Sequence, residues 1–338
     1  MFHDSQKRLR YVDSFLRKRL IHLNLQLLYT CNFRCHICDF WKEPYRSLPQ
    51  LSVPQIQVIA EKLKQLGPQV ISLGRGEPLM HKELLNIVRI LSHNNFLAMI
   101  CNGWFVTPEN ARALFQAGMY EVSISVDYAM PQKHDEQRGV EGAFERAVNG
   151  LKILHENRIS PHQRVQMISV VMDDNLEDIE PLILQARKIG VTYLVTLYSD
   201  GRGKKETKAS CQDVSEHLLK LKRKYRDFVA LPRYLEQFSE AVANNGIVPC
   251  YAGKNLFNID SQGNVTLCID RLDDPVGNIL TDDIHDLEQK LLDQHRKNHC
   301  RGCWTSCRGL LEPMMYGKNK LRDFWHFYQM TKDVPLVH

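Results

Sequence analysis

Ten cysteines are the residues of this 338-residue chain whose type and spacing point most directly to chemistry. Three lie within Cys31–Cys38 and five within Cys250–Cys307, while Cys101 and Cys211 stand apart. The charged N-terminal segment lacks the apolar stretch of a secretory signal, so we expect a cytoplasmic protein without a disulfide framework. Clustered thiols in a reducing compartment predict metal or iron–sulfur ligands.

The first group is Cys31-Asn-Phe-Arg-Cys35-His-Ile-Cys38, directly after a leucine-rich run at 23–28. Three thiolates at this spacing can meet one centre if the chain loops around it. A zinc site would need a fourth ligand, and His36 and His22 are the nearest candidates. A [4Fe–4S] cluster usually takes four cysteines, so three would leave one iron open to a small chelating ligand. The alternatives are structural zinc or unrelated buried thiols.

The elements that must position these cysteines alternate between short apolar runs and helical patterns. The runs have the length and composition of strands buried in a parallel sheet. After 23–28 they are 70–73, 97–101, 122–126, 165–171 and 193–197. Between them, Ser52 with Gln55 predicts a capping box, and Thr107-Pro108 predicts a second helix start. The alternation predicts βα units with right-handed crossovers, and it places the first cysteine loop at the carboxyl end of strand one.

The C-x3-C-x2-C pattern after a first strand resembles the signature of the radical S-adenosylmethionine (SAM) superfamily. The resemblance implies an α/β fold with a partial (β/α)6, TIM-like barrel, and a [4Fe–4S] cluster held by Cys31, Cys35 and Cys38. It implies that the open iron chelates SAM, and that reduction cleaves SAM to a 5′-deoxyadenosyl radical that abstracts hydrogen from a substrate. An electron donor such as flavodoxin or ferredoxin is implied as a partner. The protein's part is to bind, orient and exclude water.

Further motifs of this superfamily follow in the expected order. Leu73-Gly-Arg-Gly-Glu-Pro-Leu79 resembles its G-G-E-P motif, with Arg75 in place of the first glycine. Asn102-Gly103 resembles T-N-G, and the segment 123–127 resembles the S-h-D motif. The residues that the resemblance implies as SAM contacts are Ile37, Gly76, Glu77, Asn102, Ser125 and Arg138. For Arg138, a surface arginine at a helix is the alternative.

The second group has a different spacing and flanks a predicted β-hairpin. The runs 255–260 and 264–269 lie on either side of Ser261-Gln-Gly263, which predicts the turn. Gly263-Asn-Val-Thr-Leu-Cys268 resembles the G-x4-C element of SPASM and twitch domains, which hold auxiliary iron–sulfur clusters. A zinc ribbon is the alternative. Five thiols supply one auxiliary [4Fe–4S] cluster with one thiol over. Cys250, Cys268, Cys300 and Cys303 are the first choice of ligands, and Cys307 is able to replace one of the C-x2-C pair, Cys300 or Cys303. The candidate ligands are Cys250, Cys268, Cys300, Cys303 and Cys307.

Two further residues are weak catalytic candidates. Cys211 follows a polar loop that begins at Asp200, and it is able to donate hydrogen to a substrate radical, although an exposed bystander is the simpler interpretation. Asp270, beside Cys268, is able to act as a base, although a surface turn is favoured. The lysines of 204–208 indicate a solvated loop, with a lid over an anionic substrate as the alternative.

Composition bounds the remaining possibilities. The chain is 43% hydrophobic and 25% charged, as expected of a globular protein, and its net charge of +5 is scattered, which indicates no nucleic-acid partner. No apolar run approaches the ~20 residues of a membrane span. We expect an N-terminal helix over 1–22, a barrel over 23–235 and a SPASM- or twitch-like domain over 236–338.

The expected activity is oxidation or dehydrogenation of a substrate, with the auxiliary cluster as electron acceptor. About 22 residues precede the first strand, too few for an N-terminal peptide-recognition domain, which favours a small-molecule substrate over a peptide. The alternatives are peptide maturation by crosslinking or epimerisation, and redox-neutral rearrangement. A non-catalytic zinc-binding or redox-sensing protein is the alternative from a different class.

Overall fold

One mixed sheet forms the centre of the protein. The computed structural model describes residues 2–199 and 214–330, and within them the sheet has nine strands in the order β6-β5-β4-β3-β2-β1-β7-β8-β9. Strands β1 to β6 are parallel to one another, which confirms the parallel α/β architecture expected from the apolar runs. These strands are β1 (His22–Gln26), β2 (Val70–Gly74), β3 (Phe96–Cys101), β4 (Met119–Ser125), β5 (Arg164–Val171) and β6 (Thr192–Leu197).

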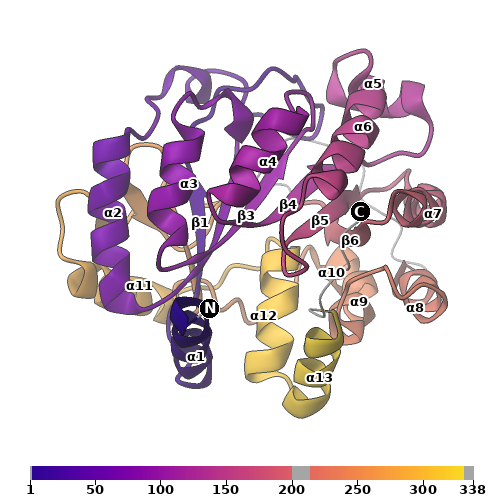
Figure 1. The fold of residues 1–338 in the computed structure, drawn as a ribbon. Coiled ribbons are helices and arrows are strands. Elements are labelled where there is room, and N and C mark those ends of the chain that lie inside the picture. Colours follow the sequence, from indigo (N-terminus) through magenta and orange to yellow (C-terminus); the bar gives the residue numbers. More distant parts are fainter. Residues whose placement is uncertain (1, 200–213, 331–338) are drawn as a thin grey trace.

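Helices between these strands cover one face of the sheet (Figure 1). Their bounds are α2 (Val53–Leu66), α3 (Leu84–Ser92), α4 (Pro108–Gln116), α5 (Pro131–Arg138), α6 (Ala143–Glu156) and α7 (Ile179–Ile189). The capping box predicted for α2 is present, with the backbone N–H of Ser52 donating to Oε1 of Gln55 at 2.9 Å. Thr107 and Asn110 form the same reciprocal cap on α4. Local sequence therefore sets where these helices begin.

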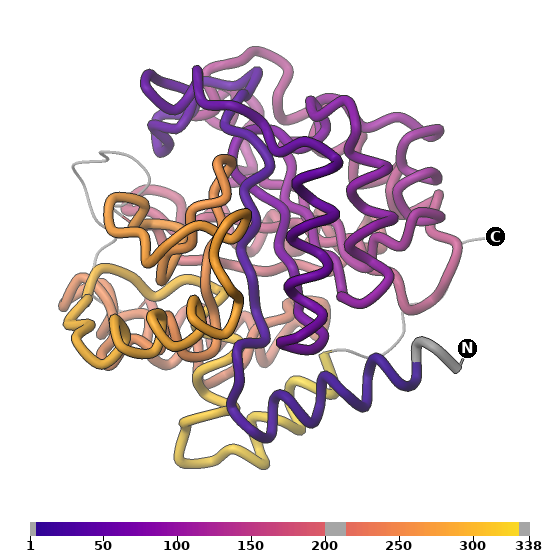
Figure 2. Tube along the Cα trace, turned by 90° about the vertical axis from the view of Figure 1, so that its left-hand side faces the viewer, coloured from indigo at the N-terminus to yellow at the C-terminus, as the bar shows by residue number. Residues whose placement is uncertain are grey.

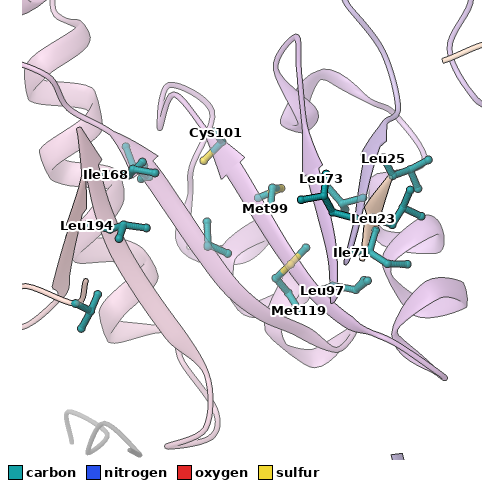
Figure 3. Close-up of a cluster of buried hydrophobic side chains, with 14 of the residues drawn as sticks. Leu23, Leu25, Ile71, Leu73, Leu97, Met99, Cys101, Met119, Ile168 and Leu194 are labelled. Carbon is teal, nitrogen blue, oxygen red and sulfur yellow. The ribbon is translucent and has the colours of Figure 1, made fainter. Parts of the chain in front are cut away.

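The strand residues alternate between a packed face and an open face. Leu23, Ile71 and Leu97 are fully buried and lie together in the core that Figure 3 draws. Ile100 lies on the central strand β3, yet 40% of it is exposed. Because successive strand residues point to opposite faces, the exposure of Ile100 means that the second face is open near the carboxyl ends of the strands.

The chain after β6 extends the same sheet instead of starting a new one. The predicted hairpin is present as β7 (Leu256–Ile259) and β8 (Asn264–Thr266), followed by β9 (Gly277–Asn278). Strand β7 pairs in parallel with β1, and His22 lies opposite Leu256. Figure 2 shows this orange segment beside the indigo first strand. The pairing brings residues 250–307 next to the strand that leads into the first cysteine loop.

The remaining α-helices of the described chain lie at the N-terminus or after β6. Those after β6 are α8 (Val214–Lys224), α9 (Pro232–Glu236), α10 (Phe238–Asn244), α11 (Ile284–Arg296), α12 (Ser306–Tyr316) and α13 (Lys320–Met330). The expected N-terminal helix is α1 (Phe2–Leu16), and Phe15 on it contacts Phe324 on α13. In the described part of the chain, no helix has both the length and the apolar character needed to cross a membrane.

Candidate functional site

The loop after β1 carries Cys31, Cys35 and Cys38 and is tied to the end of α5. The backbone N–H of Arg34 donates to the carbonyl of Arg138 at 3.2 Å, and that of His36 to the carbonyl of Gln137 at 2.9 Å. The amide of Cys38 closes a turn on the carbonyl of Cys35 at 3.2 Å. These bonds curl the loop, so that the three thiols belong to one compact segment, as the spacing predicts.

Gly76 and Glu77 lie directly against the start of this loop. The amide of Glu77 donates to the carbonyl of Thr30 at 2.9 Å. Gly76 has φ +55°, and a Cβ there would lie 2.5 Å from the carbonyl oxygen of Thr30 and 2.8 Å from the carbonyl carbon of Tyr29. Glycine is therefore required at position 76 by both conformation and space.

The Glu77 carboxylate connects the second and third strand ends. One oxygen accepts the Leu79 amide at 3.0 Å and the other accepts the Asn102 amide at 2.8 Å. The side chain of Asn102 in turn donates to Asn32, inside the cysteine loop, at 2.8 Å. Burial raises the pKa of Glu77 to about 7, and the two amide donors oppose that rise.

Arg138 is buried instead of lying on the surface, so the surface alternative is wrong. Its guanidinium forms an ion pair of 2.5 Å with the fully buried carboxylate of Asp127, and it lies 3.9 Å from the sulfur of Cys35. Burial raises the pKa of the Cys35 thiol, and the positive charge of Arg138 opposes that rise. Ile37 is buried nearby with Tyr128 and Met172.

The remaining residue of the first set, Ser125, ends β4 and is partly exposed. Five of the six, Ile37, Gly76, Glu77, Asn102 and Ser125, therefore lie at carboxyl ends of strands or on the loops that follow them, and Arg138 ends α5, the helix after β4. SAM contact by these six residues stays a prediction.

The second cysteine group surrounds a cavity on the β1–β7 side of the sheet. The cavity is lined by all five predicted ligands, with residues from β1, the hairpin end and α12 beside them. These lining residues include Cys250, Cys268, Cys300, Cys303, Cys307, Asn24, Asp270, Asn298 and Arg308. The thiol of Cys307 donates to Oδ1 of Asn24 on β1 at 3.8 Å. Residues more than 200 positions apart thus meet in one place.

Asp270 lies in a turn, as expected, but its side chain is largely buried and not at the surface. Its carboxylate pairs with Arg75 at 2.7 Å and accepts a hydrogen bond from Ser199 at 3.1 Å, and its side chain is 12% exposed. Arg75 also donates to the carbonyl of Ile269 at 2.6 Å and stacks on the ring of Phe40 at 3.7 Å. The arginine that replaces a motif glycine therefore bridges the two cysteine regions. The other weak candidate, Cys211, lies outside the described residues.

A buried chain of hydrogen bonds also joins the two regions. The amide of Gln26 on β1 donates to Asn258 at 2.7 Å, and Asn258 donates to the hydroxyl of Thr266 at 3.0 Å. That hydroxyl donates to the carbonyl of Cys268 at 3.1 Å. Gln26, Asn258 and Thr266 are fully buried. Satisfied buried networks of this kind hold the elements they join in one arrangement.

Both cysteine groups offer the sulfur ligands and the N–H contacts to sulfur that suit an iron–sulfur cluster. Within 2–199 and 214–330, no three histidine, cysteine or acidic residues are grouped closely enough to hold a single metal ion. In each group a backbone N–H donates to the sulfur of the cysteine two residues earlier. The N–H of Phe33 donates to Cys31 and that of Gly302 donates to Cys300, both at 3.4 Å. Such bonds to sulfur are typical of cluster sites and tune their potential.

Burial favours the protonated form of three of the cysteine thiols. It raises the pKa of Cys31 to about 12 and that of Cys250 to about 11. It also raises the pKa of Cys268, beside the carboxylate of Asp270. Metal ligation requires thiolates, so cluster assembly would release these protons and be favoured at higher pH.

Sequence reasoning missed three residues, two that line the cavity and one in the buried hydrogen-bond chain beside it. Asn24 and Gln26 alternate with leucines in β1, and polar residues at alternate positions of a buried strand are a signal that was available. Arg308 follows Cys307 directly and is buried, but nothing in the local sequence separates it from a surface arginine. The contact between Arg75 and Asp270 joins residues 195 positions apart, for which no local pattern exists.

The six parallel strands and the three-thiol loop that follows the first of them agree with the α/β architecture expected from the sequence. The family model for the radical SAM superfamily matches residues 25–186. This match covers just under half of the chain, and it supports the expected likeness to the superfamily and the SAM and [4Fe–4S] cluster which that likeness implies.

Curated relatives of several kinds align with the chain. An AdoMet-dependent heme synthase of Oleidesulfovibrio alaskensis is 27% identical over 178 residues, which are 51% of this chain and 44% of that protein. A probable GTP 3′,8-cyclase of Saccharolobus islandicus is 27% identical over 279 residues, 78% of this chain and 87% of that protein. The chain spans about half the length of the heme synthases that it matches.

Solved structures share the fold. SuiB of Streptococcus suis superimposes with a TM-score of 0.65 at 16% identity, covering 84% of this chain and 69% of that one. The anSMEcpe structure with bound AdoMet has a TM-score of 0.64 at 16% identity, covering 92% of this chain and 96% of that one. At this identity the likeness concerns the fold.

Proposed function

We propose that the protein is a SAM-cleaving oxidoreductase with two [4Fe–4S] clusters, the second of which accepts an electron from the substrate. The single observation that carries this proposal is the convergence of Cys250, Cys268, Cys300, Cys303 and Cys307 on one cavity. A cluster held by four protein thiolates has no open iron, which suits it to electron transfer. The residues 236–338 would then form the SPASM- or twitch-like part of the chain.

The first site would be held by Cys31, Cys35 and Cys38. When bound there, the cluster and SAM supply the reductive cleavage that starts radical chemistry. The chain's own part is electrostatic and steric. The Glu77 carboxylate would accept a hydrogen bond from the SAM amino group, and the Arg138 guanidinium would attract the SAM carboxylate.

The second site would take Cys250, Cys268, Cys300 and Cys303, with Cys307 able to replace Cys300 or Cys303. The bridge from Arg75 to Asp270 and the chain from Gln26 to Cys268 support a fixed arrangement of the two sites. Oxidation of the substrate by two electrons needs hydrogen abstraction, then loss of one electron to the second site and of one proton. Asp270, next to that site, is the candidate acceptor of the proton.

The proposed substrate is a small molecule, and the proposed electron donor is a flavodoxin or ferredoxin. The heme synthase and cyclase relatives carry names of small-molecule chemistry, and the cyclase aligns over most of this chain. Peptide maturation is the second candidate, because one structure with this fold is SuiB bound to its precursor peptide SuiA. Incubation with a substrate panel, with 5′-deoxyadenosine as the readout, separates the two classes.

Iron and sulfide analysis of anaerobically purified protein tests the two-cluster proposal. We expect about eight irons in the wild type, about four in Cys268→Ala, and SAM cleavage under dithionite that survives in Cys268→Ala but not in Cys31→Ala. Cys101→Ala is the matched control, since Cys101 is buried in the core outside both groups and should leave iron unchanged. Iron that is the same in Cys268→Ala and wild type, or zinc alone, would contradict the proposal.

A further inference from the structure

Arg308 is a buried cation at the wall of the second cysteine cavity. It follows Cys307 in the first turn of α12, and 3% of it is exposed. One guanidinium nitrogen donates to the carbonyl of Cys303 at 2.6 Å and lies 3.9 Å from the sulfur of the same residue. Another donates to the carbonyls of Ile247 at 2.9 Å and Pro249 at 3.0 Å. One side chain thus gathers the segments that carry Cys250, Cys303 and Cys307.

Glu312 is the anion that compensates this charge. It lies one turn further along α12, and its two carboxylate oxygens accept from Arg308 at 2.8 Å and 3.0 Å. Glu312 is also buried, and it accepts the amide of Tyr251, next to Cys250, at 3.2 Å. The guanidinium lies 3.9 Å from the Cys303 sulfur and lines the cavity, whereas Glu312 is not among the lining residues. The cation of the pair is therefore the member that faces the cavity.

We propose that Arg308 raises the reduction potential of the auxiliary cluster, with Glu312 limiting that effect. This inference rests on the proposed auxiliary cluster. Reduction adds one negative charge to a cluster, and a fixed cation beside a ligand sulfur favours the reduced form. The effect is strong because the site is buried, where charges are weakly screened. A higher potential makes the cluster a better acceptor for an electron from the substrate.

The alternative role for Arg308 is purely structural, and charge substitutions separate the two. Glu312→Gln keeps the shape of the side chain and leaves the cation uncompensated, so it should move the potential of the second cluster upward. The double variant Arg308→Gln with Glu312→Gln removes both charges, so it should have a lower potential than Glu312→Gln. We expect the reduction equilibrium constants of these two proteins to differ at least tenfold, which is about 59 mV for one electron.

The experiment is a redox titration of the iron-loaded protein, followed by electron paramagnetic resonance. The couple of the second cluster is the one that Cys268→Ala lacks, and the couple of the first cluster serves as the internal control that should not move. Iron is measured in every variant. If the double variant does not hold eight irons, Arg308→Lys replaces it in the comparison. This variant keeps the positive charge and loses the forked contacts. The reduction potential of its second cluster should stay near that of the wild type, while the potential in Glu312→Gln should be higher.

Three results have distinct meanings. A higher potential in Glu312→Gln than in both wild type and the double variant supports the inference. Equal potentials in proteins that hold eight irons overturn it while leaving the two-cluster proposal intact. A single couple in the wild type overturns the proposed auxiliary cluster, and this inference with it.

Discussion

Replacing Gly76 by alanine should disturb the first site from a position that carries no functional group. Gly76 has φ +55°, and the added Cβ would lie 2.5 Å from the Thr30 carbonyl oxygen. The left-handed conformation costs an alanine roughly 1–2 kcal/mol. The backbone contact adds roughly 1–3 kcal/mol as overpacking. The free energy of unfolding should therefore fall by roughly 2–5 kcal/mol, and the strain falls on the segment that leads to Cys31.

Gly74 provides the matched control for this substitution. It lies two residues earlier at the end of β2, and a Cβ there would meet nothing within 4 Å. Gly74→Ala should therefore change stability by no more than about 0.5 kcal/mol. Urea unfolding followed by circular dichroism gives the stabilities, and iron content with SAM cleavage reports the site. Equal midpoints and equal iron for the two variants would refute the close-packing argument.

Two further substitutions test the electrostatics of the first site. The pKa of Glu77 is raised from 4.5 to about 7, so the stability it contributes is fully present below pH 4.5 and is lost as the pH rises through about 7. The urea concentration at the unfolding midpoint of the wild type should therefore fall as the pH rises from 4.5 to about 7, and this fall should be smaller in Glu77→Gln. The same pH dependence in both proteins would contradict the burial argument. Asp127→Asn leaves Arg138 as a buried unpaired cation and should cost about 3–5 kcal/mol. Asp13→Asn, which breaks the exposed pair with Arg17, should cost at most about 1 kcal/mol. Similar losses for these two variants would contradict the buried pair.

Local patterns predicted the parallel strands, two helix starts and the hairpin. Apolar runs of four to seven residues gave the parallel strands, and reciprocal caps at Ser52 and Thr107 gave two helix starts. The turn at Ser261–Gly263 gave the hairpin. These features are determined by residues close together in the sequence, so they can be predicted without the structure.

The features that sequence reasoning missed depend on distant partners. The parallel pairing of β7 with β1 brings the hairpin into the barrel sheet. The residues of either strand predict that it is a strand, but they do not predict which strand it pairs with. Arg75 is the clearest case. It adopts φ +65°, the conformation that suits the motif's glycine, and its side chain pairs with Asp270 far along the chain. The substitution could be seen in the sequence, but its partner could not.

The central claim is that an iron coordinated by Cys31, Cys35 and Cys38 has a vacant position for SAM. The direct test uses Cys268→Ala, which should retain the first cluster alone, reduced with dithionite and measured by electron paramagnetic resonance with and without SAM. A change in the g-values of the cluster signal on adding SAM is the predicted result. A spectrum that SAM leaves unchanged, or reduced protein with no cluster signal, would contradict the claim.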